Sequence, residues 1–72
     1  MAMKKTLLQQ LSGYLSPEEL RKVDKASRLF SKKTRDKLLL WLLFEAKFKC
    51  EPKIDDKVDA FLYKIFKNEI FY

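Results

Sequence analysis

Eight basic side chains lie between residues 21 and 37, and a cluster of positive charges of this kind can bind anions. Only Asp24 and Asp36 oppose them there, so the segment alone carries a formal charge of +6. The whole chain also carries +6, because the remaining residues hold equal numbers of acidic and basic side chains. About one quarter of the sequence therefore carries the entire excess of positive charge.

Seven of these basic residues are expected to contact the phosphates of a nucleic acid. The first four fall within about 60° of one another on a helix with about 100° per residue. The last three follow at the expected start of the next helix, where N–H groups and the helix dipole favour anions. A solvated lysine-rich face that keeps a small protein soluble is the alternative interpretation. The seven residues are Arg21, Lys25, Arg28, Lys32, Lys33, Arg35 and Lys37.

A helix-turn-helix drawn through the same segment would offer few base-reading side chains. The second helix would present Thr34, Arg35 and Lys37 before its apolar run begins at Leu38. The turn also lacks the glycine that is usual in this motif. The sequence therefore favours contacts to the phosphate backbone over recognition of bases.

Catalytic and metal-binding residue types are scarce. The chain has no histidine and one cysteine, Cys50, which excludes the common zinc sites and the usual Cys–His and Ser–His nucleophile pairs. A single glycine leaves no glycine-rich phosphate loop. Asp55, Asp56 and Asp59 are interpreted as the favourable negative first turn of a helix, not as a metal site. We predict a protein that is not an enzyme and has no metal or cofactor.

The elements that must position the basic residues are helices. Hydrophobic residues make up 47% of the chain, whereas only one glycine and two prolines are present to make turns. A chain of 72 residues has room for one core, so residues 1–72 are expected to form a single helical domain. The predicted fold class is all-α, a compact bundle of three to four short helices with a central apolar helix.

The first two helices have clear starting points. Thr6 is a good N-cap for a helix that Gly13 should end or weaken. Ser16 begins the clearest helix of the chain, with Pro17 at the first helical position and Glu19 three residues after the cap. Its apolar spacing extends it to about Phe30.

The third helix contains the seven apolar residues from Leu38 to Phe44. Either Ser31 or Thr34 can cap this helix, and a single continuous helix through this region is the alternative. Pro52 is expected to end it. Seven residues go almost twice around a helix axis, so every side of this helix is apolar and needs cover. We expect Trp41 and Phe44 in the core. Cys50 is expected to be a small buried side chain, and its basic neighbours Lys47 and Lys49 leave a reactive role open.

The fourth helix is predicted to start between Lys53 and Asp55. Its apolar residues follow helical spacing and are expected to form one buried stripe. Those residues are Ile54, Val58, Phe61, Leu62, Ile65 and Phe66.

The chain has more apolar side chains than so small a bundle can easily bury. This excess predicts a homodimer. The expected interface consists of Trp41, Phe44, Phe66, Ile70 and Phe71. The second hypothesis is a protein adaptor or inhibitor that docks on a larger partner through the apolar third helix or through the C-terminal aromatic residues. The leading hypothesis is a regulatory or accessory factor associated with nucleic acid.

A membrane partner is not expected, because the longest apolar run is far below the roughly 20 residues that span a bilayer. Binding of the basic helix to a membrane surface is a weaker third hypothesis, since Phe30 is its only aromatic residue. The N-terminal residues do not resemble a secretory signal, and a lone cysteine is unusual in small secreted domains. We therefore expect a cytoplasmic location.

Overall fold

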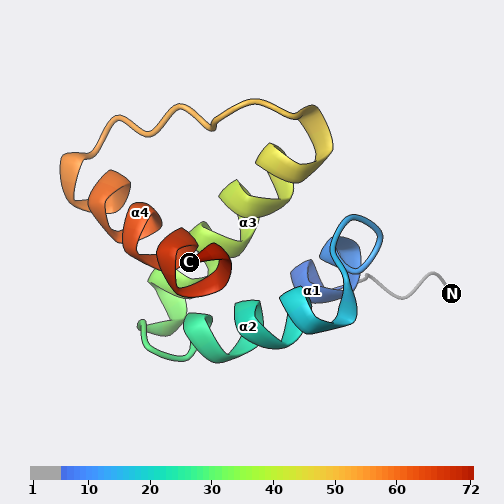
Figure 1. The fold of residues 1–72 in the computed structure, drawn as a ribbon. Helices are drawn as coiled ribbons and strands as arrows, with labels where there is room; N and C mark the ends of the chain where they lie inside the picture. The colour runs from blue at the N-terminus through green and yellow to red at the C-terminus, as the bar shows by residue number, and fades with distance from the viewer. Residues whose placement is uncertain (1–5) are drawn as a thin grey trace, which may run out of the picture.

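Four α-helices and no strands make up the part of the chain that the computed structural model describes, residues 6–72. Residues 1–5, where the comparison with a secretory signal begins, lie outside this range. The helices form a small all-α bundle, as the sequence predicts (Figure 1). Their bounds are α1 Leu7–Leu11, α2 Pro17–Ser27, α3 Lys32–Phe48 and α4 Lys57–Phe71.

The predicted starts of α1 and α2 are confirmed, and each is a complete capping box. The Thr6 hydroxyl accepts a hydrogen bond from the Gln9 backbone N–H, and the Gln9 side chain accepts one from the Thr6 N–H. Ser16 and Glu19 repeat this exchange at α2, with Pro17 at the first helical position. Side chains close in sequence therefore fix both helix starts.

Helix α2 ends at Ser27, three residues earlier than the apolar spacing suggests. The backbone N–H groups of the next three residues bond to carbonyls three positions back, which tightens the chain into a turn. This turn brings the Phe30 ring edge-on to Phe66, with 6.2 Å between centroids. Ser31 then caps α3 by accepting from the Thr34 N–H, so Ser31 and not Thr34 begins the helix.

Helix α3 ends at Phe48, before Pro52 could stop it. Lys49 adopts the left-handed conformation, with φ 59° and ψ 29°, and its N–H bonds to the Glu45 carbonyl. A residue in this conformation closes a helix, although glycine usually occupies the position. Cys50 follows and is exposed, so its predicted burial is wrong.

Helix α4 starts at Lys57, later than predicted, and buries a different face. Asp56 caps it by accepting from the N–H groups of Val58 and Asp59. The buried residues are Tyr63, Phe66 and Ile70. The predicted stripe is wrong at Val58 and Phe61, which are 66% and 62% exposed. Both faces have helical spacing and share Phe66, and the packing of α2 and α3 selects the one that also contains Tyr63 and Ile70.

Helices α3 and α4 run parallel, and three contacts join residues that are 22 positions apart. Lys37 pairs with Asp59 at 3.7 Å, and Lys67 pairs with Glu45 at 2.9 Å. Between them, the Trp41 and Tyr63 rings meet edge-on at 5.9 Å. Parallel neighbours require the chain to return along their length. The extended segment 49–56 does this and arches over the two helices in Figure 1.

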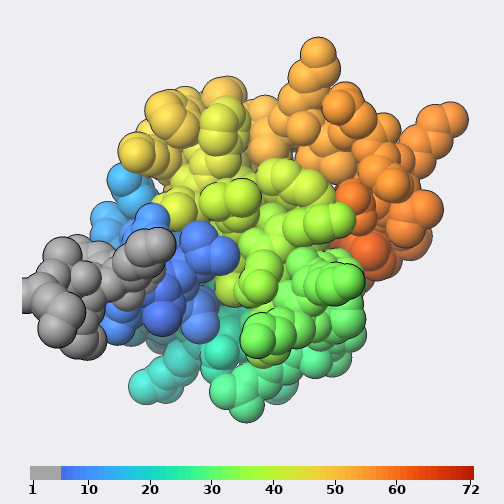
Figure 2. Space-filling model, turned by 180° about the vertical axis from the view of Figure 1, so that it is seen from behind, coloured from blue at the N-terminus to red at the C-terminus, as the bar shows by residue number. Residues whose placement is uncertain are grey.

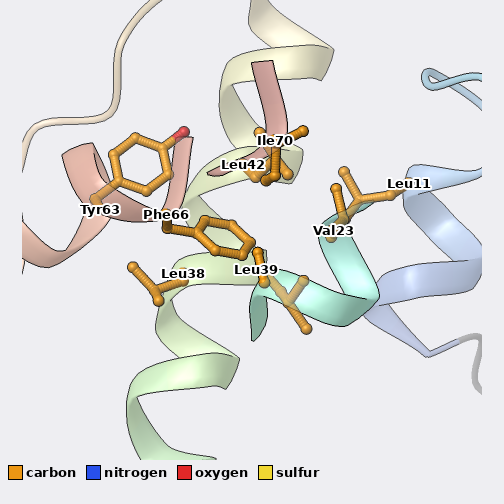
Figure 3. Packing of buried hydrophobic residues seen from close by; sticks show 9 residues of the cluster. Leu11, Val23, Leu38, Leu39, Leu42, Tyr63, Phe66 and Ile70 are labelled. Atoms are coloured by element: carbon orange, nitrogen blue, oxygen red, sulfur yellow. The ribbon is translucent and has the colours of Figure 1, made fainter. Parts of the chain in front are cut away.

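The core lies between α2, α3 and α4, with α1 closing one end. Figure 3 shows the Phe66 ring directed into the middle of this cluster, next to Leu38 and Leu39. Burying nine such side chains supplies the main favourable free energy of folding. The nine are Leu11, Val23, Ala26, Leu38, Leu39, Leu42, Tyr63, Phe66 and Ile70.

Among residues 6–72, none of the helices combines the length and the apolar character that crossing a bilayer requires.

Candidate functional site

The basic segment 21–37 folds into a corner, where α2 ends and α3 begins. We call this region the α2–α3 corner. It lies at the lower left of Figure 1, at the opposite end of α3 from the start of the segment that leads to α4. Because α2 ends at Ser27, the four residues of the predicted stripe do not share one helix. Arg21 and Lys25 belong to α2, Arg28 follows its last turn, and Lys32 is the first residue of α3.

Two of the eight basic side chains in the corner have ion-pair partners. Arg28 lies 3.2 Å from Asp24, one turn earlier. Lys37 reaches across to Asp59 on α4. The other six form no ion pair with any of residues 6–72, and five of them are exposed. The five exposed residues are Arg21, Lys22, Lys25, Lys32 and Lys33.

Arg35 is the half-buried member of the six. It lines a shallow depression of about 240 Å³, where α1 approaches the start of α3. Lys32 lies at the same depression, as do Asp24 and Asp36. The field of these two carboxylates reduces the attraction of an anion to this side of the corner. The strongest uncompensated charge therefore lies on the outer side of α2 and at Lys33.

The three candidate base-reading side chains are not free to contact bases. The Thr34 hydroxyl accepts a hydrogen bond from the Ser31 hydroxyl at 3.1 Å. Arg35 is half-buried, and Lys37 is held by Asp59. This arrangement suits contacts to a backbone better than insertion of α3 into a groove.

The first turn of α3 also differs electrostatically from those of α2 and α4. Helix α2 starts with Glu18 and Glu19, and α4 has Asp59 in its first turn, which is the favourable sign at a helix N-terminus. Helix α3 has no acidic residue in its first turn and begins with Lys32 and Lys33. A bound anion would interact favourably with both lysines and with the helix dipole.

The predicted oligomer interface is only partly available at the surface. Phe66 and Ile70 are 0% and 2% exposed, so the expectation that they form an interface is wrong. Both point into the core, because the face of α4 that packs against α2 and α3 consists of Tyr63, Phe66 and Ile70. Phe44 is 40% exposed, so its expected place in the core is wrong, and Phe71 is 41% exposed. Trp41 is half-buried against Tyr63 instead of lying fully in the core.

Sequence reasoning named Phe44 as an interface residue but missed Leu40 and Phe48, which lie with it on the side of α3 that faces away from the core. Leu40, Phe44 and Phe48 are exposed there, and the last two rings are 4.8 Å apart. In Figure 2, α3 crosses the middle of this side of the molecule without a helix on top of it. The run of seven apolar residues did indicate that this helix needs burial on all sides. It did not indicate which of these residues would remain exposed.

The buried phenol of Tyr63 is the one group in residues 6–72 whose pKa is clearly shifted. Burial raises the pKa of Tyr63 well above its ordinary value, and the negative charge of Glu45 adds to the effect. The hydroxyl has no hydrogen-bond partner of acceptable geometry. Because Tyr63 lies inside the bundle, its shift reflects packing and not a reactive site.

The acidic residues before α4 have structural partners. Asp56 caps the helix, and Asp59 pairs with Lys37. Within residues 6–72, no group of three or more candidate metal ligands comes together.

Comparison with known proteins gives no family, no curated relative and no solved structure that matches this chain.

Proposed function

We propose that this chain is a small, non-enzymatic accessory protein that binds nucleic acid through phosphate contacts at the α2–α3 corner. The observation that carries the proposal is the localisation of charge. The entire net charge of +6 belongs to residues 21–37, and six of their eight basic side chains form no ion pair within residues 6–72. A nucleic acid gains affinity at such a surface by releasing the counterions of its phosphates.

The first turn of α3 supports the proposal independently. Each cation near a helix N-terminus costs about 0.3–1 kcal/mol relative to an uncharged residue, because it opposes the helix dipole. Lys32 and Lys33 lie there without a compensating acid in the same turn. Neutralisation by phosphate would turn this unfavourable arrangement into a favourable one.

The shape of the corner favours binding without base specificity. The free cations lie on the outer side of α2 and at the start of α3, and Thr34 is engaged with Ser31. Contacts of this kind fix the position of a protein on a nucleic acid but carry no sequence information. We expect similar affinities for nucleic acids of unrelated sequence. A cytoplasmic location is a separate prediction.

The test is the salt dependence of binding to a generic DNA duplex, measured by fluorescence anisotropy. Neutralising three exposed residues, Arg21→Gln, Lys25→Gln and Lys33→Gln, should lower the affinity and make the slope of log K against log salt shallower by about 2 to 3. The matched control is Lys49→Gln, Lys53→Gln and Lys64→Gln, which removes the same charge at exposed positions away from the corner.

The control variant should retain a slope close to that of the unmodified chain. Equal losses in the two triple variants would show that net charge alone drives binding, and would contradict a site at the corner. An absence of salt-dependent binding to duplex and to single strands would contradict the function itself. Circular dichroism checks that both variants remain helical.

A further inference from the structure

The outer face of α3 is apolar, exposed and flanked by charges. Leu40 and Phe48 are 54% and 57% exposed, although both are large apolar side chains. Together with Trp41 and Phe44 they border an open groove of about 530 Å³, which Pro52 also lines.

A ridge of four residues runs along the edge of this face, on the side next to α1: Asp36, Leu40, Leu43 and Lys47. Their spacing of four, three and four residues places them in one row on a helix. Asp36, Leu40 and Lys47 are exposed, and Leu43 is half-buried. Neither Asp36 nor Lys47 forms an ion pair with any of residues 6–72, although Lys47 lies over the Phe48 ring at 5.6 Å.

This ridge complements itself when one copy is reversed. An antiparallel neighbour puts Asp36 opposite Lys47 and Leu40 opposite Leu43, and the two-fold axis repeats both pairs. A parallel neighbour would instead place Asp36 against Asp36 and Lys47 against Lys47. Opposite charges at the ends and leucines between them are what an isologous helix pair requires.

The antiparallel arrangement also separates the two basic corners. With the axis between residues 41 and 42, the starts of the two α3 helices lie about 30 Å apart along the helix direction at 1.5 Å per residue. This exceeds the Debye length of about 8–10 Å near physiological salt, so repulsion between the corners is largely screened. The net charge of the chain therefore does not prevent pairing in this orientation.

We propose that the outer face of α3 is covered by a second copy of this chain, with the two α3 helices antiparallel across a two-fold axis. The pair buries Leu40 and Leu43 at its seam, covers Phe44 beside them, and joins Asp36 of each copy to Lys47 of its partner. A specific interface buries about 800 Å² per partner, or about one seventh of the 5851 Å² surface of this chain.

A second exposed apolar row supplies a matched control. Val58 and Phe61 lie with the half-buried Ile65 on the solvent side of α4. The row continues at Asn68, which is uncharged, so it lacks the opposite charges that make the α3 ridge self-complementary.

Sedimentation equilibrium across micromolar concentrations tests the assembly. The unmodified chain is expected to have twice its mass of 8.7 kDa. Leu40→Glu should give a monomer with unchanged helicity, because Leu40 is exposed in the folded chain. Phe61→Glu should leave the dimer intact. A monomeric unmodified chain overturns the proposal, as does a dimer that Phe61→Glu dissociates and Leu40→Glu does not.

Charge exchange tests the antiparallel register. Asp36→Lys and Lys47→Asp should each weaken dimerisation by about tenfold or more, since the two-fold axis creates two like-charged pairs in each variant. The double variant exchanges the two charges and should restore an affinity close to that of the unmodified chain. A double variant as weak as the single ones overturns the antiparallel pairing.

Discussion

The two faces of α3 consist of the same kinds of residue but lie in opposite surroundings. Leu38 and Leu42 on the inner face are 0% and 2% exposed, whereas Leu40 on the outer face is 54% exposed. Phe44 continues the outer face with 40% of its surface exposed. Hydropathy does not distinguish these positions, so their difference comes from the helices around them.

The comparison shows that a small bundle has too few helices to cover all sides of α3. Helices α1, α2 and α4 contact the inner side and flanks of α3, and none of residues 6–72 lies over the outer face. A helix that is apolar on all sides needs further cover. The inner face therefore stabilises the folded chain, and the outer face stays exposed.

The largest effect should come from exchanging a leucine on each face for alanine. Leu42→Ala is expected to lower the free energy of unfolding by about 2–5 kcal/mol, because it leaves a cavity in the core. Leu40→Ala should change it by less than about 0.5 kcal/mol when measured on the monomer, as is usual for surface positions. Urea denaturation of both variants, at concentrations low enough for each to be a monomer, gives the comparison.

Equal losses of stability in the two variants would contradict the contrast between the faces. They would mean that the outer face is as well packed as the inner one.

Trp41 lies at the boundary between the faces and sharpens the comparison. Full burial of this ring would make Trp41→Ala cost about 3–5 kcal/mol. Half-burial and one edge-on contact with Tyr63 should reduce the loss to about 2 kcal/mol. Thermal and urea unfolding measure this value. A loss below about 1 kcal/mol would place Trp41 with the outer face instead.

Tyr63→Phe should have a small effect on stability at neutral pH and a distinct pH dependence. Tyr63→Phe removes a buried hydroxyl that has no hydrogen-bond partner, so stability at neutral pH should stay the same or rise by about 1 kcal/mol.

The sign of the pH effect follows from the raised pKa of Tyr63 in the folded chain. Above about pH 10 the unfolded chain loses its phenolic proton while the folded chain keeps it. The free energy of unfolding should therefore fall by about 1.4 kcal/mol per pH unit from this group. Tyr63→Phe should remove that part of the decline, measured by urea titrations between pH 9 and 11. An unchanged decline would contradict the burial of the hydroxyl.

Local signals predicted the helix starts well. Ser16, Pro17 and Glu19 act on backbone groups within three residues, so no distant contact is needed to place the start of α2. The same holds for Thr6 at α1. The concentration of charge in residues 21–37 was likewise visible before the fold was known, because it depends only on residue types.

The prediction of the buried face of α4 was wrong because contacts with residues distant in the sequence determine that face. Its sequence offers two overlapping apolar faces, one with Val58 and Phe61 and the other with Tyr63, Phe66 and Ile70. The second face is buried because Phe30 and Trp41 meet its aromatic rings. Those partners lie more than 20 positions away, and hydrophobic spacing within α4 contains no information about them.

The sequence by itself determined that the chain is helical, where its first helices start and where its charge gathers, because each depends on neighbours along the chain. The tertiary structure decided that the basic stripe turns a corner, that α4 lies parallel to α3, and that one side of α3 stays uncovered. These outcomes depend on which apolar faces meet, and several pairings satisfy the same helical spacing. Packing in three dimensions selects among them through particular contacts such as Phe30 with Phe66 and Lys67 with Glu45.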